Sequence, residues 1–141
     1  MILVTVVGEG LMGDKFQMQK HQGLETIILY PQFAMRFLML IFIVLIAPVF
    51  EEMLFRGLLQ TTFRGVIHSP WAAILIASAV FSVIHPYWMH WPALFILSIC
   101  LGYAYEKSGS LIRSIFIHVF FNAVSVILSL CQQSPACLHL F

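Results

Sequence analysis

The sequence predicts an all-α fold, a polytopic membrane bundle of about four transmembrane helices. Of its 141 residues, 61% are hydrophobic and only 9% are charged, and the mean hydropathy is +0.97. Soluble domains carry roughly 25% charged residues, so this chain has too little charge to cover a water-facing surface. Strands are disfavoured, because an open sheet edge leaves backbone groups unpaired in hydrocarbon and four segments are too few for a closed barrel.

Four apolar runs account for the predicted helices. A membrane span needs about 20 mostly apolar residues; the first and last runs meet this length, and the middle two approach it with their flanks. Proline, glycine and serine in the intervening breaks are residues at which one helix can end and the next begin. The runs are 33–50, 71–84, 91–105 and 111–130.

These helices are predicted to form one domain, residues 33–131. Residues 1–32 contain five of the thirteen charged residues and are predicted to be a polar leader outside the membrane. The apolar stretch at 1–7 is too short for a cleavable signal and has no basic stretch before it. Residues 132–141 are predicted to be a short tail.

The composition also argues against several classes of function. A soluble enzyme, a nucleic-acid-binding protein and a disordered segment each need solvated charge or a basic stripe, and a net charge of +1 supplies neither. The three cysteines, Cys100, Cys131 and Cys137, form no Cys-x-x-Cys pair and no disulfide framework. We therefore expect a lipid bilayer as the environment and no nucleic-acid partner.

Two adjacent carboxylates, Glu51 and Glu52, lie in the first apolar stretch, which resumes beyond Arg56. Charged side chains inside a membrane helix cost about 2.5–3.5 kcal/mol each on insertion scales, so these require compensation or a function. Glu52 and Arg56 are four residues apart, the spacing of an ion pair on one helical face. Glu51, about 100° around the helix, is then freer to act as a general base. Alternatively, the pair marks a helix end at the membrane interface.

Two later helices each carry a histidine in an apolar background. Phe81 and His85 are four residues apart on the second helix, and His118 and Asn122 are four apart on the fourth. Taken alone, each polar residue is compatible with a structural hydrogen bond between helices. At ~1.5 Å of rise per residue, however, Glu52 and both histidines reach the membrane interior within about two turns of one another. We therefore expect one shared polar cavity, which inside a membrane indicates a functional site.

These residues, in this order, resemble the motifs of the CPBP family of intramembrane proteases. That family includes the CAAX prenyl endopeptidases of the Ras-converting type and bacteriocin-processing or immunity proteins. Its pattern is a glutamate pair followed by arginine, then Phe-x-x-x-His, then His-x-x-x-Asn or Asp. The resemblance covers roughly residues 40–130, and its matching residues are Glu51, Glu52, Arg56, Phe81, His85, His118 and Asn122.

The resemblance implies that the protein hydrolyses a peptide bond of a membrane-associated protein or peptide. Glu51 would activate water, with His85 nearby. His118 and Asn122 would hold the developing oxyanion, a role in which preset donors are usually the largest catalytic term. Glu52 and its arginine partner would orient the site. The expected location is a cell membrane, in a multi-pass topology, and the short loops suggest a prokaryotic plasma membrane.

Metal dependence is left open by the sequence. Glu51, His85 and His118 are a plausible zinc ligand set. Against this, the chain has no His-Glu-x-x-His motif that would place two histidine ligands on one helix. Zinc-dependent and metal-free activation of water are therefore both retained.

An alternative function is a non-catalytic membrane scaffold of the same fold that binds another membrane protein. The short chain motivates it, since members of the family usually have further membrane helices before the glutamate helix. A proton-coupled transporter or channel subunit would also need buried Glu, Arg and His, but the chain lacks the inverted repeats typical of transporters.

Overall fold

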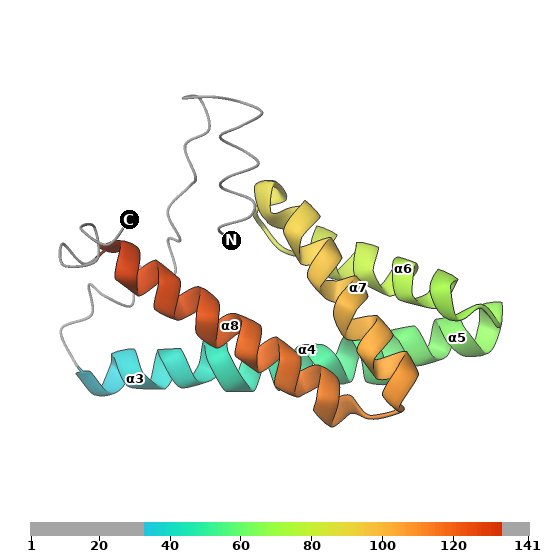
Figure 1. Ribbon diagram of the computed structural model, residues 1–141, viewed down its shortest axis with the longest axis horizontal. Helices are drawn as coiled ribbons and strands as arrows, with labels where there is room; N and C mark the ends of the chain where they lie inside the picture. Colours follow the sequence, from blue (N-terminus) through green and yellow to red (C-terminus); the bar gives the residue numbers. More distant parts are fainter. Residues whose placement is uncertain (1–32, 134–141) are drawn as a thin grey trace.

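A computed structural model describes residues 33–133 of the chain, and the predicted leader lies outside the described residues, as does most of the predicted tail. Within 33–133 the chain contains helices and no strand, which confirms the predicted all-α fold. One long helix is followed by three shorter ones (Figure 1). They are Phe33–Ile67, α6 (Pro70–Val83), α7 (Trp91–Ser108) and α8 (Leu111–Gln133), with a single 3-10 turn, η4 (Trp88–His90), before α7.

The long first helix switches from α-helical to π-helical hydrogen bonding twice and returns to α-helix each time. Two of its segments are π-helical, and they lie on either side of the segment that ends with the glutamate pair. π-Helical turns inside α-helices occur frequently at functional sites. In chain order the segments are α3 (Phe33–Ile41), η2 (Phe42–Ile46), α4 (Ala47–Glu52), η3 (Met53–Gln60) and α5 (Thr61–Ile67).

Pro48 explains why the backbone carbonyl of Ile43 in η2 has no hydrogen-bond partner within its own helix. The Ala47 N–H donates to the Phe42 carbonyl, five residues back. The next donor in this register would be residue 48, but proline has no N–H, so the Ile43 carbonyl lacks its helical partner. Asn122 of α8 fills the gap, because its Nδ2 donates to the Ile43 oxygen at 3.1 Å.

The helices end where the sequence predicted breaks. The first helix ends before His68, which adopts a left-handed conformation with φ of 60°. Ser69 then caps α6 by accepting from the Ala72 N–H at 3.4 Å, and Pro70 occupies the start of that helix. α7 ends at Gly109, whose φ of 63° is one that glycine adopts without strain.

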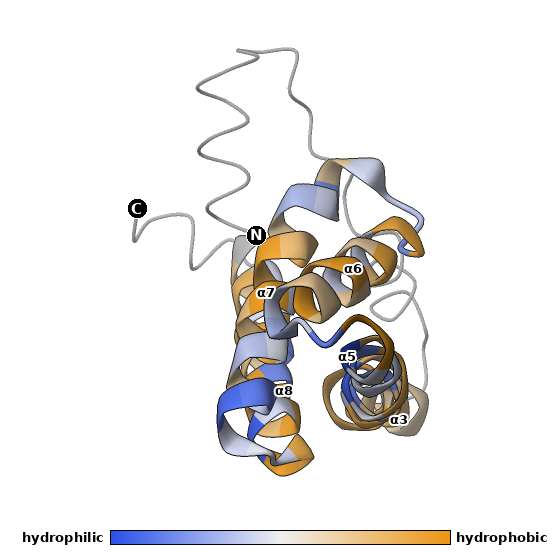
Figure 2. Ribbon diagram, turned by 90° about the vertical axis from the view of Figure 1, so that its right-hand side faces the viewer, coloured by the Kyte–Doolittle hydropathy of each residue, from blue (hydrophilic) through white to orange (hydrophobic). Residues whose placement is uncertain are grey.

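The described helices form a membrane helix bundle. Two are long and apolar enough to cross a bilayer, Phe33–Ile67 and Leu111–Cys131. α6 has 14 residues, or about 21 Å at 1.5 Å per residue, which is shorter than a hydrocarbon core of about 30 Å. Hydrophobic residues prevail along the helices (Figure 2), and many large ones are exposed. That α6 and α7 also cross the membrane stays a prediction.

The interior of the bundle is as polar as it is apolar. Its apolar part centres on Phe81 and Leu101, each with no exposed surface, and on small residues such as Ala73 that allow close helix packing. The buried polar residues form a second set, in which charged and hydroxyl side chains predominate. They are Glu52, Arg56, Gln60, Ser78, Ser82, Ser98, Ser114, His118 and Ser129.

Candidate active site

Glu52 is a fully buried carboxylate with three hydrogen-bond partners. It has no exposed surface, and three donors from two helices surround its carboxylate. Arg56 Nη1 donates to Oε1 at 2.7 Å, and His118 Nδ1 lies 2.9 Å from the same oxygen. Ser114 donates its hydroxyl to Oε2. Such a saturated carboxylate can remain buried and ionised, because each oxygen is matched by a donor.

Arg56 is held on its other side by α7. Its Nη2 donates to the Ser98 carbonyl at 2.9 Å and to the Ser98 hydroxyl at 2.8 Å. The guanidinium also lies over the ring of Phe81, 5.2 Å from the ring centroid. The buried ion pair therefore joins the first helix to α7, while Glu52 joins the same helix to α8.

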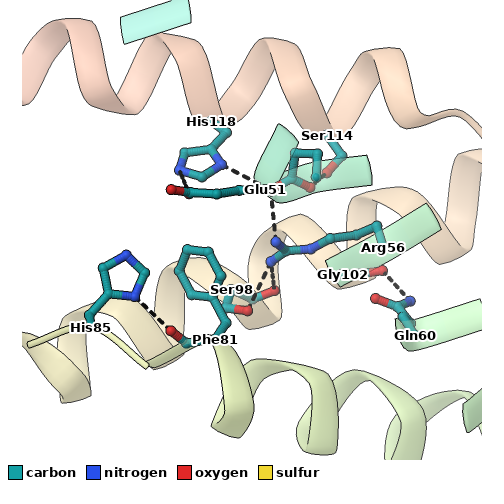
Figure 3. A network of polar contacts seen from close by, with 10 residues as sticks. Glu51, Arg56, Gln60, Phe81, His85, Ser98, Gly102, Ser114 and His118 are labelled. Carbon is teal, nitrogen blue, oxygen red and sulfur yellow. Dashed lines mark hydrogen bonds and ion pairs between the residues drawn. The ribbon is translucent and has the colours of Figure 1, made fainter. Parts of the chain in front are cut away.

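His118 contacts both glutamates, and Figure 3 shows its ring next to Glu51. Its Nδ1 faces Glu52, as described, and its Nε2 lies 3.5 Å from Glu51 Oε2. Because the Glu52 carboxylate accepts, Nδ1 must carry a proton, and the second nitrogen is turned toward the other carboxylate. The imidazole is thus oriented by one glutamate and presented to the other.

Glu51 differs sharply from its neighbour in exposure. Its side chain is 32% exposed, against 0% for Glu52. It interacts electrostatically with both His118 and His85, and more strongly with the former. Of the two adjacent carboxylates, Glu51 is therefore the one that a water molecule and a substrate can approach.

His85 has a defined tautomer. Its Nδ1 lies 2.7 Å from the Phe81 carbonyl oxygen, which can only accept, so Nδ1 carries a proton and, in the neutral ring, Nε2 has the lone pair. Figure 3 shows its ring beside that of Phe81, with Glu51 and His118 above the two rings. The His85 carbonyl in turn accepts from the indole nitrogen of Trp91 at 2.9 Å.

Asn122 lies one helical turn beyond His118 on α8, and its amide donates to the Ile43 carbonyl of η2. The structure therefore divides the six predicted site residues into three groups according to their contacts. Glu51, Glu52, Arg56 and His118 are in direct contact, His85 joins them through the ring of Phe81, and Asn122 occupies the adjoining turn.

The predicted zinc ligands do not converge in this arrangement. Among residues 33–133, no group of three or more His, Cys, Asp and Glu side chains is placed so that it could hold a metal ion. His118 lies 3.5 Å from Glu51, but His85 contacts the ring of Phe81, which in turn contacts His118. As arranged, the set of Glu51, His85 and His118 does not fit a zinc ion.

Sequence reasoning missed three members of the network: Ser98, Ser114 and Gln60. Two of them carried a signal. Ser114 precedes His118 by four residues, and Gln60 follows Arg56 by four, so each extends a helical face that was already polar. Ser98 carried none, because a lone serine in an apolar helix is common.

Comparison with known families gives one match. The family model described as type II CAAX prenyl endopeptidase Rce1-like matches residues 33–124. The matched segment includes all six predicted site residues. No curated protein and no solved structure was found to match the chain.

Proposed function

This chain belongs to the Rce1-like family of type II CAAX prenyl endopeptidases, and on that premise we propose that it is an intramembrane endopeptidase using Glu51 as general base. Family membership makes it a membrane protein of a protease family. The proposal adds that residues 33–131 form the catalytic domain, in a multi-pass protein of a prokaryotic plasma membrane. Its substrate would be a membrane-associated protein or peptide, of the CAAX type or a bacteriocin or immunity-related one.

The proposal rests on the difference in burial and hydrogen bonding between the two adjacent glutamates. Glu52 is buried and already accepts hydrogen bonds from three donors, so it is a poorer proton acceptor for water than an accessible carboxylate. Glu51 is part-exposed and faces His118. The adjacent pair therefore divides into a fixed anion that organises the site and an accessible base.

In the proposed reaction, Glu51 takes a proton from water while the water oxygen bonds to the scissile carbonyl carbon. The carbonyl electron pair moves onto its oxygen, and N–H donors on the α8 face stabilise that oxyanion. Protonated His118 would donate through Nε2, and Asn122 retains a second amide N–H beyond the one given to Ile43. Collapse of the oxyanion breaks the C–N bond, and Glu51 returns its proton to the leaving amine.

In the proposed reaction, His85 orients the attacking water. Its Nε2 has a lone pair that can accept a hydrogen bond from the attacking water, because Nδ1 is occupied by the Phe81 carbonyl. This fixes the orientation of the water without requiring His85 to change its protonation state. The ring contact with Phe81, at 4.8 Å between centroids, holds the imidazole in place.

The decisive experiment measures cleavage of a prenylated peptide with a CAAX terminus, and of unprenylated membrane peptides, by purified protein in proteoliposomes. Glu51→Gln should lower kcat by at least ~10²-fold, the usual contribution of a general base, and leave the melting temperature unchanged. Cys100→Ser, at an exposed position on α7, is the control and should retain full activity. Full activity of Glu51→Gln would overturn the assignment of Glu51 as general base, whereas no cleavage by the unmodified protein would favour the scaffold alternative.

A further inference from the structure

Three side-chain contacts join the first helix to α7 at one constant separation in sequence. Each contact links residues 42 apart, and each lies four residues, or about one helical turn, beyond the previous one on both helices. The two helices therefore run in the same direction with a constant offset over these contacts, and Figure 1 shows α7 inclined across the first helix. We call this set the polar ladder; its rungs are Arg56 with Ser98, Gln60 with Gly102, and Arg64 with Glu106.

The middle rung depends on close approach of the two helices. Gln60 is 1% exposed, and its Nε2 donates to the Gly102 carbonyl at 3.1 Å and to Glu106 Oε2 at 3.4 Å. A Cβ atom at position 102 would lie 2.8 Å from Gln60 Oε1 and 3.2 Å from a methyl group of Ile74. A larger residue at position 102 would therefore force the end of the glutamine side chain to shift away from its position against α7.

The glutamine is not explained by packing alone. Its Oε1 is buried and has no hydrogen-bond partner among the described residues. Burying an unsatisfied acceptor is unfavourable, and an apolar side chain of similar size would avoid it. What Gln60 supplies and an apolar residue could not is the directed N–H contact to one particular carbonyl of α7.

The outer rung links the ladder to the ends of the two helices. Arg64 Nε lies 3.1 Å from Glu106 Oε1, and these side chains are 40% and 25% exposed. The Glu106 carboxylate therefore contacts Arg64 through one oxygen and Gln60 through the other. Next to this rung, the Thr61 hydroxyl lies 3.3 Å from the Tyr105 hydroxyl.

We propose that the polar ladder sets the register of α7 against the first helix, and that Gln60 is a positioning residue for Arg56. An apolar interface would permit α7 to slip by a turn, a displacement of about 5.4 Å. Ser98 would then move away from Arg56, which would lose its two hydrogen bonds to α7. Without them the guanidinium would be less fixed in position, and its hydrogen bond to Glu52 would weaken. The catalytic part of this inference rests on the proposed function, whereas the register itself does not.

The first experiment compares Gln60→Met, which keeps the volume and removes the donor, with Gly102→Ala. Gly65→Ala is the matched control, because nothing lies within 4 Å of a Cβ there. We expect both ladder variants to lower kcat at least tenfold with KM changed less than twofold, and the control to behave as the unmodified protein. A role limited to general stability would reduce the amount of active enzyme without this split, once activity is normalised to folded protein. Full kcat in Gln60→Met would overturn the proposal.

A second experiment is independent of catalysis and so separates failure of the ladder from failure of the proposed function. Melting temperatures are measured in detergent for Gly102→Ala, Gln60→Ala and the double variant. If the glutamine and glycine are in contact as described, Gly102→Ala will lower the melting temperature less in the Gln60→Ala background than alone. Strictly additive shifts would overturn the ladder, whether or not any peptide is cleaved.

Discussion

Ser114 donates a hydrogen bond to Glu52 from one helical turn before His118, so two side chains on one face of α8 hold the same carboxylate. Ser114→Ala removes the only donor at Glu52 Oε2 among the described contacts and leaves that oxygen buried. We expect a loss of about 1–3 kcal/mol in stability, the cost of an unsatisfied buried group, together with lower activity. Chemical unfolding in detergent measures the first and peptide cleavage the second.

The control for that variant is Ser129→Ala, also on α8. Ser129 is buried as well, but its hydroxyl donates to the Ser125 carbonyl of its own helix, at 2.8 Å. This substitution should affect neither stability nor activity appreciably. Equal effects of the two substitutions would show that Ser114 does not support Glu52.

Substitution by glutamine should have different effects on stability at the two glutamates. Glu52→Gln neutralises one member of a buried pair and leaves Arg56 uncompensated, a change that costs about 3–5 kcal/mol in buried ion pairs. Glu51→Gln alters a part-exposed side chain and should leave the unfolding free energy nearly unchanged while removing activity. Unfolding of both variants side by side provides the measurement, and similar stability losses would contradict the division of roles.

Asn122 and Pro48 should be coupled although they lie on different helices. Asn122→Ala leaves the Ile43 carbonyl, at an exposed position, without its donor and should lower the stability of the protein. Pro48→Ala restores a backbone N–H that can reach that carbonyl, so it should reduce the cost of Asn122→Ala. A double-mutant cycle of unfolding free energies tests this coupling. Additive effects would mean that proline does not create the need for Asn122.

Trp91 should support His85 through the backbone. Trp91→Phe keeps an aromatic ring but removes the indole N–H that donates to the His85 carbonyl. We expect a several-fold loss of kcat, because the histidine lies just beyond the end of α6, where its own helix gives it little support. Trp71→Phe is the control, since Trp71 is exposed and stacks on Tyr103, away from the site. Comparable losses in the two variants would exclude a specific role.

Treatment with a chelator tests metal dependence. The histidine and glutamate donors do not converge on a common point in the described residues, so we expect cleavage to continue after chelation and dialysis. Loss of activity that zinc restores would contradict this expectation.

The sequence by itself determined the helical fold, the positions of the breaks and the motif residues. Composition dictates a membrane environment, and proline, glycine and serine act locally to end helices. The Glu52–Arg56 contact could also be predicted, because a spacing of four residues on one helix fixes the geometry.

Only the tertiary structure decided which glutamate is buried, which donors surround it and how α7 is aligned. Ser114 and His118 reach Glu52 across 62 and 66 residues of sequence, and the ladder spans 42. Contacts at such separations depend on how helices pack and rotate against one another. Apolar periodicity specifies this weakly here, because lipid and protein interior favour the same side chains. The roles of neighbouring residues such as Glu51 and Glu52 are therefore set by the bundle rather than by their own helix.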